Sequence, residues 1–466
     1  MTGAGELTSA CWAAMRADAR ALDTLEVHDT GAWLGGPLAV DDLAVAATAT
    51  ALLAASELAQ ARGASRPSVG LSGEHAALSF TSERHMLVAG RPTGAGFAPL
   101  SRLVRCLHGG WARTHANYPH HATALERALA IDLAHSTDPV ATLEAAAGLL
   151  DAIALEDAVF AASGCAAALR TAEEWARHPA GRAVAAAALI VWEDSMATRS
   201  PRPVGRAARA SKPAAGVRVL DLTRVIAGPV AGRTLAALGA EVLRVDPPSL
   251  PELPQQHLDT GAGKRTAVLD LADCHARETL LAGADVVLMG YRPDALARFG
   301  MRSDDLAQRH PHLVQVSLSA WGTDGPWAQR RGFDSLVQVA CGIAVACADA
   351  DGAPGVLPAQ ALDHATGQLM AGAALRALAG RARGEAVSPA RLSLAATAAA
   401  LLRAPRPLQA TDDLTGRADP SRHRVAFGDV ALIAPPGTLD GEPLGWAHGP
   451  RQLGGDPPAW TAQPPD

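Results

Sequence analysis

Lysine is almost missing from this chain, and aromatic residues are scarce. Only Lys212 and Lys264 are lysines among the 41 Lys and Arg residues, and Phe, Trp and Tyr together make up 4% of the sequence. The basic residues are dispersed without a polybasic run, and the formal net charge is −6. A nucleic-acid-binding protein would concentrate basic residues on one stretch or face. We therefore expect no nucleic acid among its partners.

Paired cysteine motifs are also missing. The 6 cysteines are scattered and include no CxxC pair, which argues against a zinc ribbon or a thioredoxin-type site. His115, His120 and His121 cluster in the segment HANYPHH, but the segment reads as a loop and no third-ligand pattern accompanies it. We interpret these histidines as local structure and predict no metal site.

The chain does not open with a basic stretch followed by an apolar segment, and charged residues interrupt its Ala-rich stretches. Signal peptides and membrane-spanning helices need uninterrupted apolar segments. The expectation is a cytoplasmic protein without a signal peptide and without a membrane partner.

With 48% hydrophobic residues over 466 positions, the chain can bury a large core. Residues 1–198 have a mostly helical pattern, with one strand-like stretch at 75–90. Composition and periodicity predict four segments: the helical half (1–198), a linker rich in Pro, Gly, Ala and Arg (199–216), an α/β half (217–403), and a Pro-rich tail with one strand at 428–437 (404–466).

The α/β half alternates short apolar runs with helical patterns. The runs are VRVLDL (217–222), EVLRVD (241–246), RTAVLDL (265–271), ADVVLMG (284–290) and LVQVSLSAWG (313–322). Such alternation predicts a parallel, doubly wound sheet. A long helical pattern follows from Asp363 to Gly380, and a further short strand is expected near Arg391–Leu394.

A faint internal repeat joins the two halves. Residues 41–72 align without gaps with part of the stretch 361–394 at an offset of 321, with Asp363 on Asp42 and Leu392–Ser393 on Leu71–Ser72. Ala-rich helices match easily by chance, so the repeat is a hypothesis.

Five ordered motifs carry a resemblance to one family. They are the βαβ unit VRVLDLTRVIAGPVAGRTLAALGAEVLRVDPP (217–248), GKRTAVLDL (263–271), GYRPDALARFGM (290–301), LVQVSLSAWGTDGPWAQRRGFDSLVQ (313–338) and ALDHATGQLMA (361–371). Together they resemble the family III (CaiB/BaiF) CoA-transferases. The resemblance implies an α/β fold with a Rossmann-like, CoA-binding sheet.

The N-terminal half carries a weaker resemblance to the same family. Segments 109–129 and 164–184 resemble pieces of its small domain, which normally follows the sheet half. The order here is therefore rearranged, as in a partial tandem fusion with a truncated first copy. The resemblance also implies a homodimer of two interlocked chains.

The resemblance implies that CoA moves from an acyl-CoA thioester to a carboxylic acid through an aspartyl anhydride and an aspartyl thioester. The matching nucleophile is Asp363, 29 residues (363 − 334) after Asp334 of the RGFD motif. Asp363 would also suit a helix N-cap, and the two roles are compatible. Asp334 is interpreted as a helix cap rather than a catalytic group. CoA and acyl-CoA are then substrates, and no permanently bound cofactor is expected.

The anionic phosphates of CoA call for Arg side chains and backbone amides in βα loops. By resemblance, Arg292, Arg298 and Arg331 are candidate CoA-binding residues, together with the backbone of Ala227 and Gly228 in the first loop. For each arginine the alternative is an ordinary solvated surface charge.

Departures from the family pattern leave two alternatives open. Phe333 stands where the family's racemases carry a proton-transferring His, Ile226 replaces a polar residue of the first loop, and Pro247 follows Asp246 where many members have Arg. No run of three glycines occurs. The alternatives are a non-catalytic or weakly active CoA-binding subunit, and an acyl-CoA isomerase or racemase that uses another base.

Overall fold

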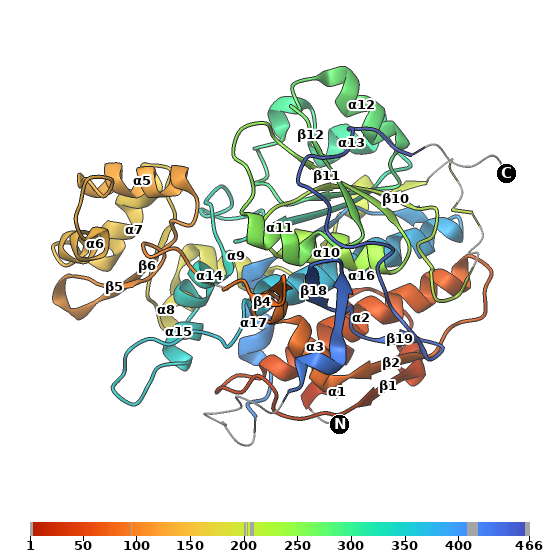
Figure 1. Cartoon of the computed structure of the whole chain (residues 1–466), viewed down its shortest axis with the longest axis horizontal. Helices are drawn as coiled ribbons and strands as arrows, with labels where there is room; N and C mark the ends of the chain where they lie inside the picture. The colour runs from red at the N-terminus through yellow and green to blue at the C-terminus, as the bar shows by residue number, and fades with distance from the viewer. Residues whose placement is uncertain are drawn as a thin grey trace.

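The computed structural model describes residues 3–94, 96–199, 202, 204–205, 209–407 and 418–461. Figure 1 shows a large lobe around a sheet and a smaller lobe to one side, formed by β5 (Leu103–Arg105), β6 (Trp111–Thr114), α5 (Pro119–Leu129), α6 (Pro139–Ala147) and α7 (Ala152–Ala161). Part of the predicted linker (200–201, 203 and 206–208) and of the predicted tail (408–417 and 462–466) lies outside the described residues.

The central sheet has seven strands in the order β12-β11-β10-β13-β14-β16-β8. The five predicted apolar runs form β10 (Arg218–Leu222), β11 (Glu241–Asp246), β12 (Lys264–Val268), β13 (Val286–Met289) and β14 (Val314–Ser319). The strand expected near 391–394 is β16 (Ala390–Ser393). These six strands are parallel, whereas β8 (Ile190–Trp192) adds an antiparallel edge from the N-terminal half. The predicted α/β class with a parallel sheet is confirmed.

Both faces of this sheet are covered, which explains why its strands read as continuous apolar runs. Successive residues of a strand point to opposite faces: Val219 and Leu288 join the large core, while Leu220 and Val287 join a second core under α12 (Cys274–Gly283) and α13 (Ser303–Arg309).

The direction in which the chain winds reverses beside β10. After β10 the chain passes through α10 (Ala227–Ala237) and builds β11 and β12 on one side, then returns to place β13 on the other side. Loops that leave the carboxyl ends of strands at such a reversal diverge and open a crevice for a ligand. The loops after β10, β13 and β14 meet at this edge.

The stretch at 75–90 was predicted as strand-like, and this prediction is wrong for most of it. The structure has α3 (Gly73–Ser79) and α4 (Ser82–His85), followed by a two-residue strand, β3 (Leu87–Val88). The hydroxyl of Ser72 accepts a hydrogen bond from the His75 amide and caps α3. A short apolar run does not by itself distinguish a strand from a buried helix.

Each part of the predicted repeat forms the same elements. α2 (Val40–Ala61) and α16 (Ala361–Ala382) begin 321 positions apart (361 − 40), as do β2 (Val69–Ser72) and β16 (390 − 69). The Ser393 hydroxyl caps α17 (Leu394–Arg403) in the way that Ser72 caps α3. The offset therefore reflects two copies of one helix–strand–helix unit.

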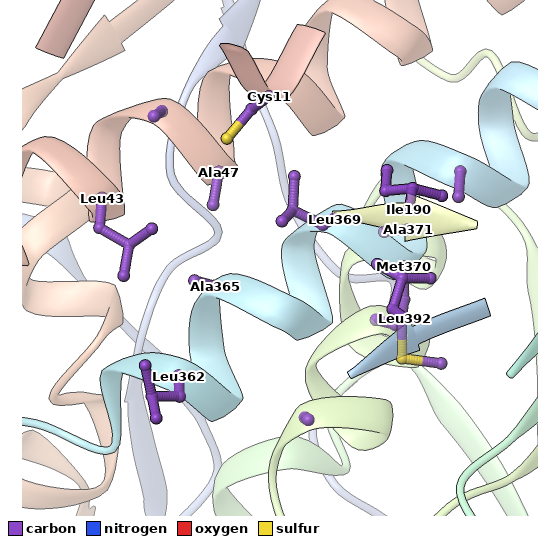
Figure 2. Close-up of a cluster of buried hydrophobic side chains, with 14 of the residues drawn as sticks. Cys11, Leu43, Ala47, Ile190, Leu362, Ala365, Leu369, Met370, Ala371 and Leu392 are labelled. Atoms are coloured by element: carbon purple, nitrogen blue, oxygen red, sulfur yellow. The ribbon is translucent and has the colours of Figure 1, made fainter. Parts of the chain in front are cut away.

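The two copies pack on each other through α2 and α16. Figure 2 shows Leu43 and Ala47 of α2 facing the Leu362, Ala365 and Leu369 side of α16. At the crossing, a Cβ added to Gly372 would lie 3.4 Å from the Cα of Ala51, its own repeat partner (372 − 51 = 321). Contacts between equivalent positions are the mark of a twofold relation. One core thus runs through both halves, and the predicted domain boundaries remain predictions.

Among the described residues, α2 is the single helix long and apolar enough by length and composition to cross a membrane, and 89% of its apolar window is buried inside the protein. We expected every Ala-rich stretch to be too short or too charged to cross a membrane, and by length and composition this expectation is wrong for α2. Its apolar residues serve the contact with α16.

The tail returns to the N-terminal half. β17 (Arg424–Phe427) and β18 (Val430–Ile433) form a hairpin. β18 pairs with β3, and β3 pairs in turn with β4 (Arg91–Pro92). β18 confirms the strand predicted at 428–437. β18 of this small sheet contacts α4, which also contacts α11 (Pro254–Thr260).

Candidate active site

Asp363, the third residue of α16, lies where two cavities meet. The larger cavity has a volume of about 630 Å³ and is called the arginine cavity here, because Arg224, Arg292, Arg298, Arg330 and Arg331 line it. The smaller one, the inner cavity, has a volume of about 300 Å³. Asp363, Phe333 and Val225 line both. The Asp363 side chain can therefore face a ligand that extends from one cavity into the other.

Asp334, the first residue of α14 (Asp334–Ala340), caps the helix that carries Asp363. Its Oδ2 accepts hydrogen bonds from the backbone N–H groups of Leu362 (2.8 Å) and Asp363 (3.0 Å). Its Oδ1 accepts one from Nε2 of Gln338 at 2.5 Å. Asp334 thus satisfies two amides at the buried N-terminal end of α16. It is a helix cap, as predicted, and the helix it caps is α16.

The Asp363 carboxyl itself makes no hydrogen bond to a protein group among the described residues. Burial raises its pKa well above the usual value, and the negative charge of Asp334 raises it further. Burial also raises the pKa of Asp334 to about 6, although Gln338 and the two amides stabilise its anion. Two close carboxylates cannot both ionise easily. When the pair holds one proton, Asp363 is the favoured site, because Gln338 and the two amides stabilise the Asp334 anion.

The arginines reach their cavity from three βα loops. Arg224 follows β10, Arg292 and Arg298 follow β13, and Arg330 and Arg331 follow β14. The structure thus brings together the three predicted arginines, Arg292, Arg298 and Arg331. Arg224 and Arg330 were missed, although each lies in a loop after a predicted strand, which was a usable signal. Fixed guanidinium groups on one wall suit a phosphate-bearing anion.

Neighbouring groups orient several of these arginines. Arg330 pairs with Glu156 at 3.2 Å and with Asp157 at 3.0 Å, and Arg331 donates to the backbone oxygen of Ser163. Since Glu156, Asp157 and Ser163 belong to the small lobe, that lobe positions the basic wall of the cavity.

The first loop has a strained and tightly packed backbone. Val225 has a φ of +71°, a region that β-branched residues rarely adopt, and its N–H donates to Oε2 of Glu252 at 2.9 Å. Ala227 lines the arginine cavity. Gly228 lines neither cavity. A Cβ there would lie 2.2 Å from Cβ of Thr223, so glycine permits close packing within the loop. Contact of both residues with CoA stays a prediction.

The histidines interpreted as local structure lie against the cavities. His120 and His121 line the arginine cavity, and His115 lines the inner cavity. The His115 ring stacks on Phe333, with centroids 3.6 Å apart and planes 5° apart. Burial holds the pKa of His115 well below its usual value, so the ring is neutral. The histidines thus form walls of the site, a role that their loop context did not indicate.

No group of three His, Cys, Asp or Glu residues suited to a metal ion occurs in the part of the chain that the structure describes.

The structure thus combines a parallel α/β sheet with an arginine-lined cavity and the buried Asp363 carboxyl, which lines both cavities. Comparison with known proteins adds a family match. Residues 214–430 match the model of CoA-transferase family III.

Named relatives match part of the chain. The chain is 36% identical to a probable fatty acyl-CoA transferase (Rv3272) of Mycobacterium tuberculosis, over 37% of this chain and 48% of the relative. It is 33% identical to a succinate–glutarate CoA-transferase of Agrobacterium fabrum, over 30% of this chain and 41% of the relative. It is also 33% identical to an acetyl-CoA:oxalate CoA-transferase of Acetobacter aceti, over 32% and 41%. The chain thus spans less than half the length of these relatives.

Among solved structures, a crystal structure of Rv3272 aligns with a TM-score of 0.38 at 36% identity, covering 40% of this chain and 55% of that one.

Proposed function

We propose that this protein is a CoA-transferase that moves CoA from an acyl-CoA thioester to a carboxylic acid through Asp363. One observation carries the proposal: the Asp363 carboxyl, without a hydrogen-bond partner among the described residues, lies between the arginine cavity and the inner cavity. Relatives named as CoA-transferases support it.

The sheet supports CoA as the ligand of the arginine cavity. Its parallel strands run, in order of appearance along the chain, 3-2-1-4-5-6, the order of Rossmann-like nucleotide-binding folds. Arg292, Arg298 and Arg331 would hold the CoA phosphates, and the start of α10 at Ala227 would approach the ligand through its backbone. CoA and acyl-CoA act as substrates, and no permanently bound cofactor is required.

The chemistry proceeds by exchange at acyl carbons. An Asp363 oxygen bonds to the thioester carbon, the C–S bond breaks, and the electron pair leaves on the CoA sulfur. The thiolate then attacks the Asp363 carbonyl of the resulting anhydride, which releases the donor acid and leaves an aspartyl thioester. The acceptor carboxylate attacks this thioester to form a second anhydride and release CoA thiolate. The thiolate finally attacks the acceptor carbonyl, giving acceptor-CoA and the Asp363 carboxylate.

A second candidate function rests on His115. Its neutral ring stacks on Phe333 and lines the inner cavity together with Asp363. A neutral imidazole can remove a proton from the carbon next to a thioester. His115 would thereby supply the base that Phe333 cannot, as an isomerase or racemase requires.

A cytoplasmic location and an interlocked homodimer remain predictions.

Hydroxylamine trapping tests the main proposal. Incubation with an acyl-CoA panel and hydroxylamine should leave a hydroxamate on Asp363, detected by mass spectrometry of its peptide. The adduct should vanish in Asp363→Ala and persist in Asp351→Ala, which changes an exposed aspartate outside both cavities.

The other functions give different results in the same assay. Solvent deuterium entering the α-carbon without an Asp363 adduct indicates isomerase or racemase chemistry. Neither adduct nor exchange with any acyl-CoA indicates a binding subunit.

A further inference from the structure

Glu156 of α7 is a buried carboxylate that pairs with two arginines. Arg170 binds it through both ends of its guanidinium, with Nη1 2.8 Å from Oε2 and Nη2 2.9 Å from Oε1. The backbone N–H of Ala168 in β7 (Ala166–Ala168) donates to Oε2 at 2.8 Å. Nη1 of Arg330 lies 3.2 Å from Oε1. Because Arg170 by itself balances the charge of Glu156, burial of this carboxylate does not require the pairing with Arg330.

The Arg330 guanidinium is held by four side chains. Besides Glu156, Asp157 pairs with its Nη2 at 3.0 Å. Its Cζ lies 4.2 Å from the centre of the Phe160 ring and 4.5 Å from that of Trp327. Both terminal nitrogens are thus already paired with carboxylates. Arg330 therefore suits a cross-link between α7 and the loop after β14 better than direct contact with a phosphate.

The next residue, Arg331, has a different environment. It also lines the arginine cavity, but within the described ranges its guanidinium donates to the uncharged backbone oxygen of Ser163 and pairs with no carboxylate. Its charge thus remains available to an anion. Nε1 of Trp321 donates to the Arg331 backbone oxygen at 3.2 Å. Because Arg330 and Arg331 share a peptide unit, the cross-link at Arg330 also sets where the Arg331 guanidinium can reach.

The small lobe is attached to this region at a second point. The backbone N–H of Arg170 donates to the backbone oxygen of Val339 in α14 at 3.2 Å, and β6 and β7 both pack on α14. α14 begins at Asp334, three residues after Arg331 (334 − 331). The strands thus dock the lobe on the helix that follows the loop, and α7 offers Glu156 as a fixed partner for Arg330.

We propose that Glu156 is a positioning residue for CoA: through Arg330 it holds Arg331 where the Arg331 guanidinium binds a CoA phosphate. This inference rests on the proposed binding of CoA in the arginine cavity and divides the roles of its arginines. A negative charge near an anion site weakens anion binding by electrostatics alone. Positioning has the opposite sign, because it makes CoA binding depend on Glu156.

Glu156→Gln in the full chain tests the proposal. Gln retains the shape of the side chain but loses the charge that holds Arg330. In isothermal titration calorimetry the Kd for CoA should rise about tenfold, the loss of one charged contact. Electrostatics alone would lower this Kd, since the variant removes a negative charge.

A thioester without phosphates separates positioning from a general structural defect. Labelling of Asp363 by an acyl-CoA in hydroxylamine should slow about tenfold in Glu156→Gln, as CoA binding weakens. Labelling by the acyl-pantetheine with the same acyl group should change less than about twofold, because this thioester has no phosphate for Arg331 to bind.

A second variant keeps the test decisive if Glu156→Gln does not fold. Phe160→Leu removes a ring that is 40% exposed from Arg330 and retains both ion pairs. Its Kd for CoA should rise about two- to fivefold. Glu144→Gln is the matched control and should bind CoA as the wild type does. Glu144 is a small-lobe glutamate paired with Arg102 at 2.9 Å, but its side chain is 47% exposed and lies outside both cavities.

Two results would overturn the inference and leave the transferase proposal standing. One is an unchanged or lower Kd for CoA in the folded variants. The other is equal slowing with acyl-CoA and acyl-pantetheine, which assigns Glu156 a structural role alone. A wild type that binds CoA but forms no Asp363 adduct with any acyl-CoA ends the transferase proposal, while the calorimetric test of Glu156 still decides the inference. A wild type that does not bind CoA removes both.

Discussion

Asp363→Asn is expected to abolish CoA transfer while stabilising the folded protein at alkaline pH. An amide cannot form the anhydride, so the rate should fall by at least about a thousandfold. Turnover of acyl-CoA with a panel of carboxylic acids measures this loss. Residual transfer within about tenfold of the wild type would remove Asp363 from the mechanism.

The stability effect follows from the raised pKa of Asp363. Burial and the charge of Asp334 raise this pKa well above the usual value for an aspartate, so the fold favours the protonated carboxyl. The stability that this preference contributes is complete below the unfolded pKa and is lost as pH rises through the folded pKa. The Asn variant has no proton to lose at this position. Its melting temperature should therefore exceed that of the wild type by a margin that grows with pH.

Thermal unfolding at several pH values between about 5 and 9 measures this margin. Asp351→Asn, an exposed aspartate, should follow the wild type throughout. A constant difference between Asp363→Asn and wild type over the whole range would contradict the shifted pKa. In the wild type, transfer should rise with pH over the same interval, because the nucleophile is the anion.

Lys264→Ala is expected to cost about 3–5 kcal/mol in the free energy of unfolding. Lys264 is completely buried, and its Nζ donates to Oδ2 of Asp221 and to the backbone oxygen of Pro229, each at 2.8 Å. Removing it leaves the Asp221 charge buried without a cation. Asp221 also holds Thr223 at the start of the first loop, so this loop should loosen and CoA binding should weaken.

Urea unfolding and binding of CoA measure the two effects. Lys212→Ala is the matched control, since Lys212 is the other lysine and donates only to the backbone oxygens of Ala237 and Gly445. The double variant Lys264→Met, Asp221→Leu should recover much of the lost stability, because it removes both charges. A single variant that loses less than about 1 kcal/mol would show that water or another cation compensates Asp221.

Local patterns in the sequence predicted secondary structure correctly where the residues of one element are enough to determine its conformation. The apolar runs of β10 and β13 are buried on both faces, so their composition alone marked them. The prediction of a strand at 75–90 was wrong because the apolar residues of this stretch fit both a helical and a strand period. The Ser72 side chain caps α3 and thereby favours the helix. The stacking of His115 on Phe333 could not be inferred from local patterns, because it depends on a contact across 218 positions (333 − 115).

By itself, the sequence determined the strands β10 to β14, the resemblance to CoA-transferase family III and the candidate nucleophile Asp363, because these depend on short patterns within single elements. Only the tertiary structure decided that Glu156 pairs with Arg330, 174 positions later (330 − 156). That placement comes from the packing of β6 and β7 on α14, which brings the small lobe beside the loop after β14. Such long-range contacts leave no period in the sequence from which they could be inferred.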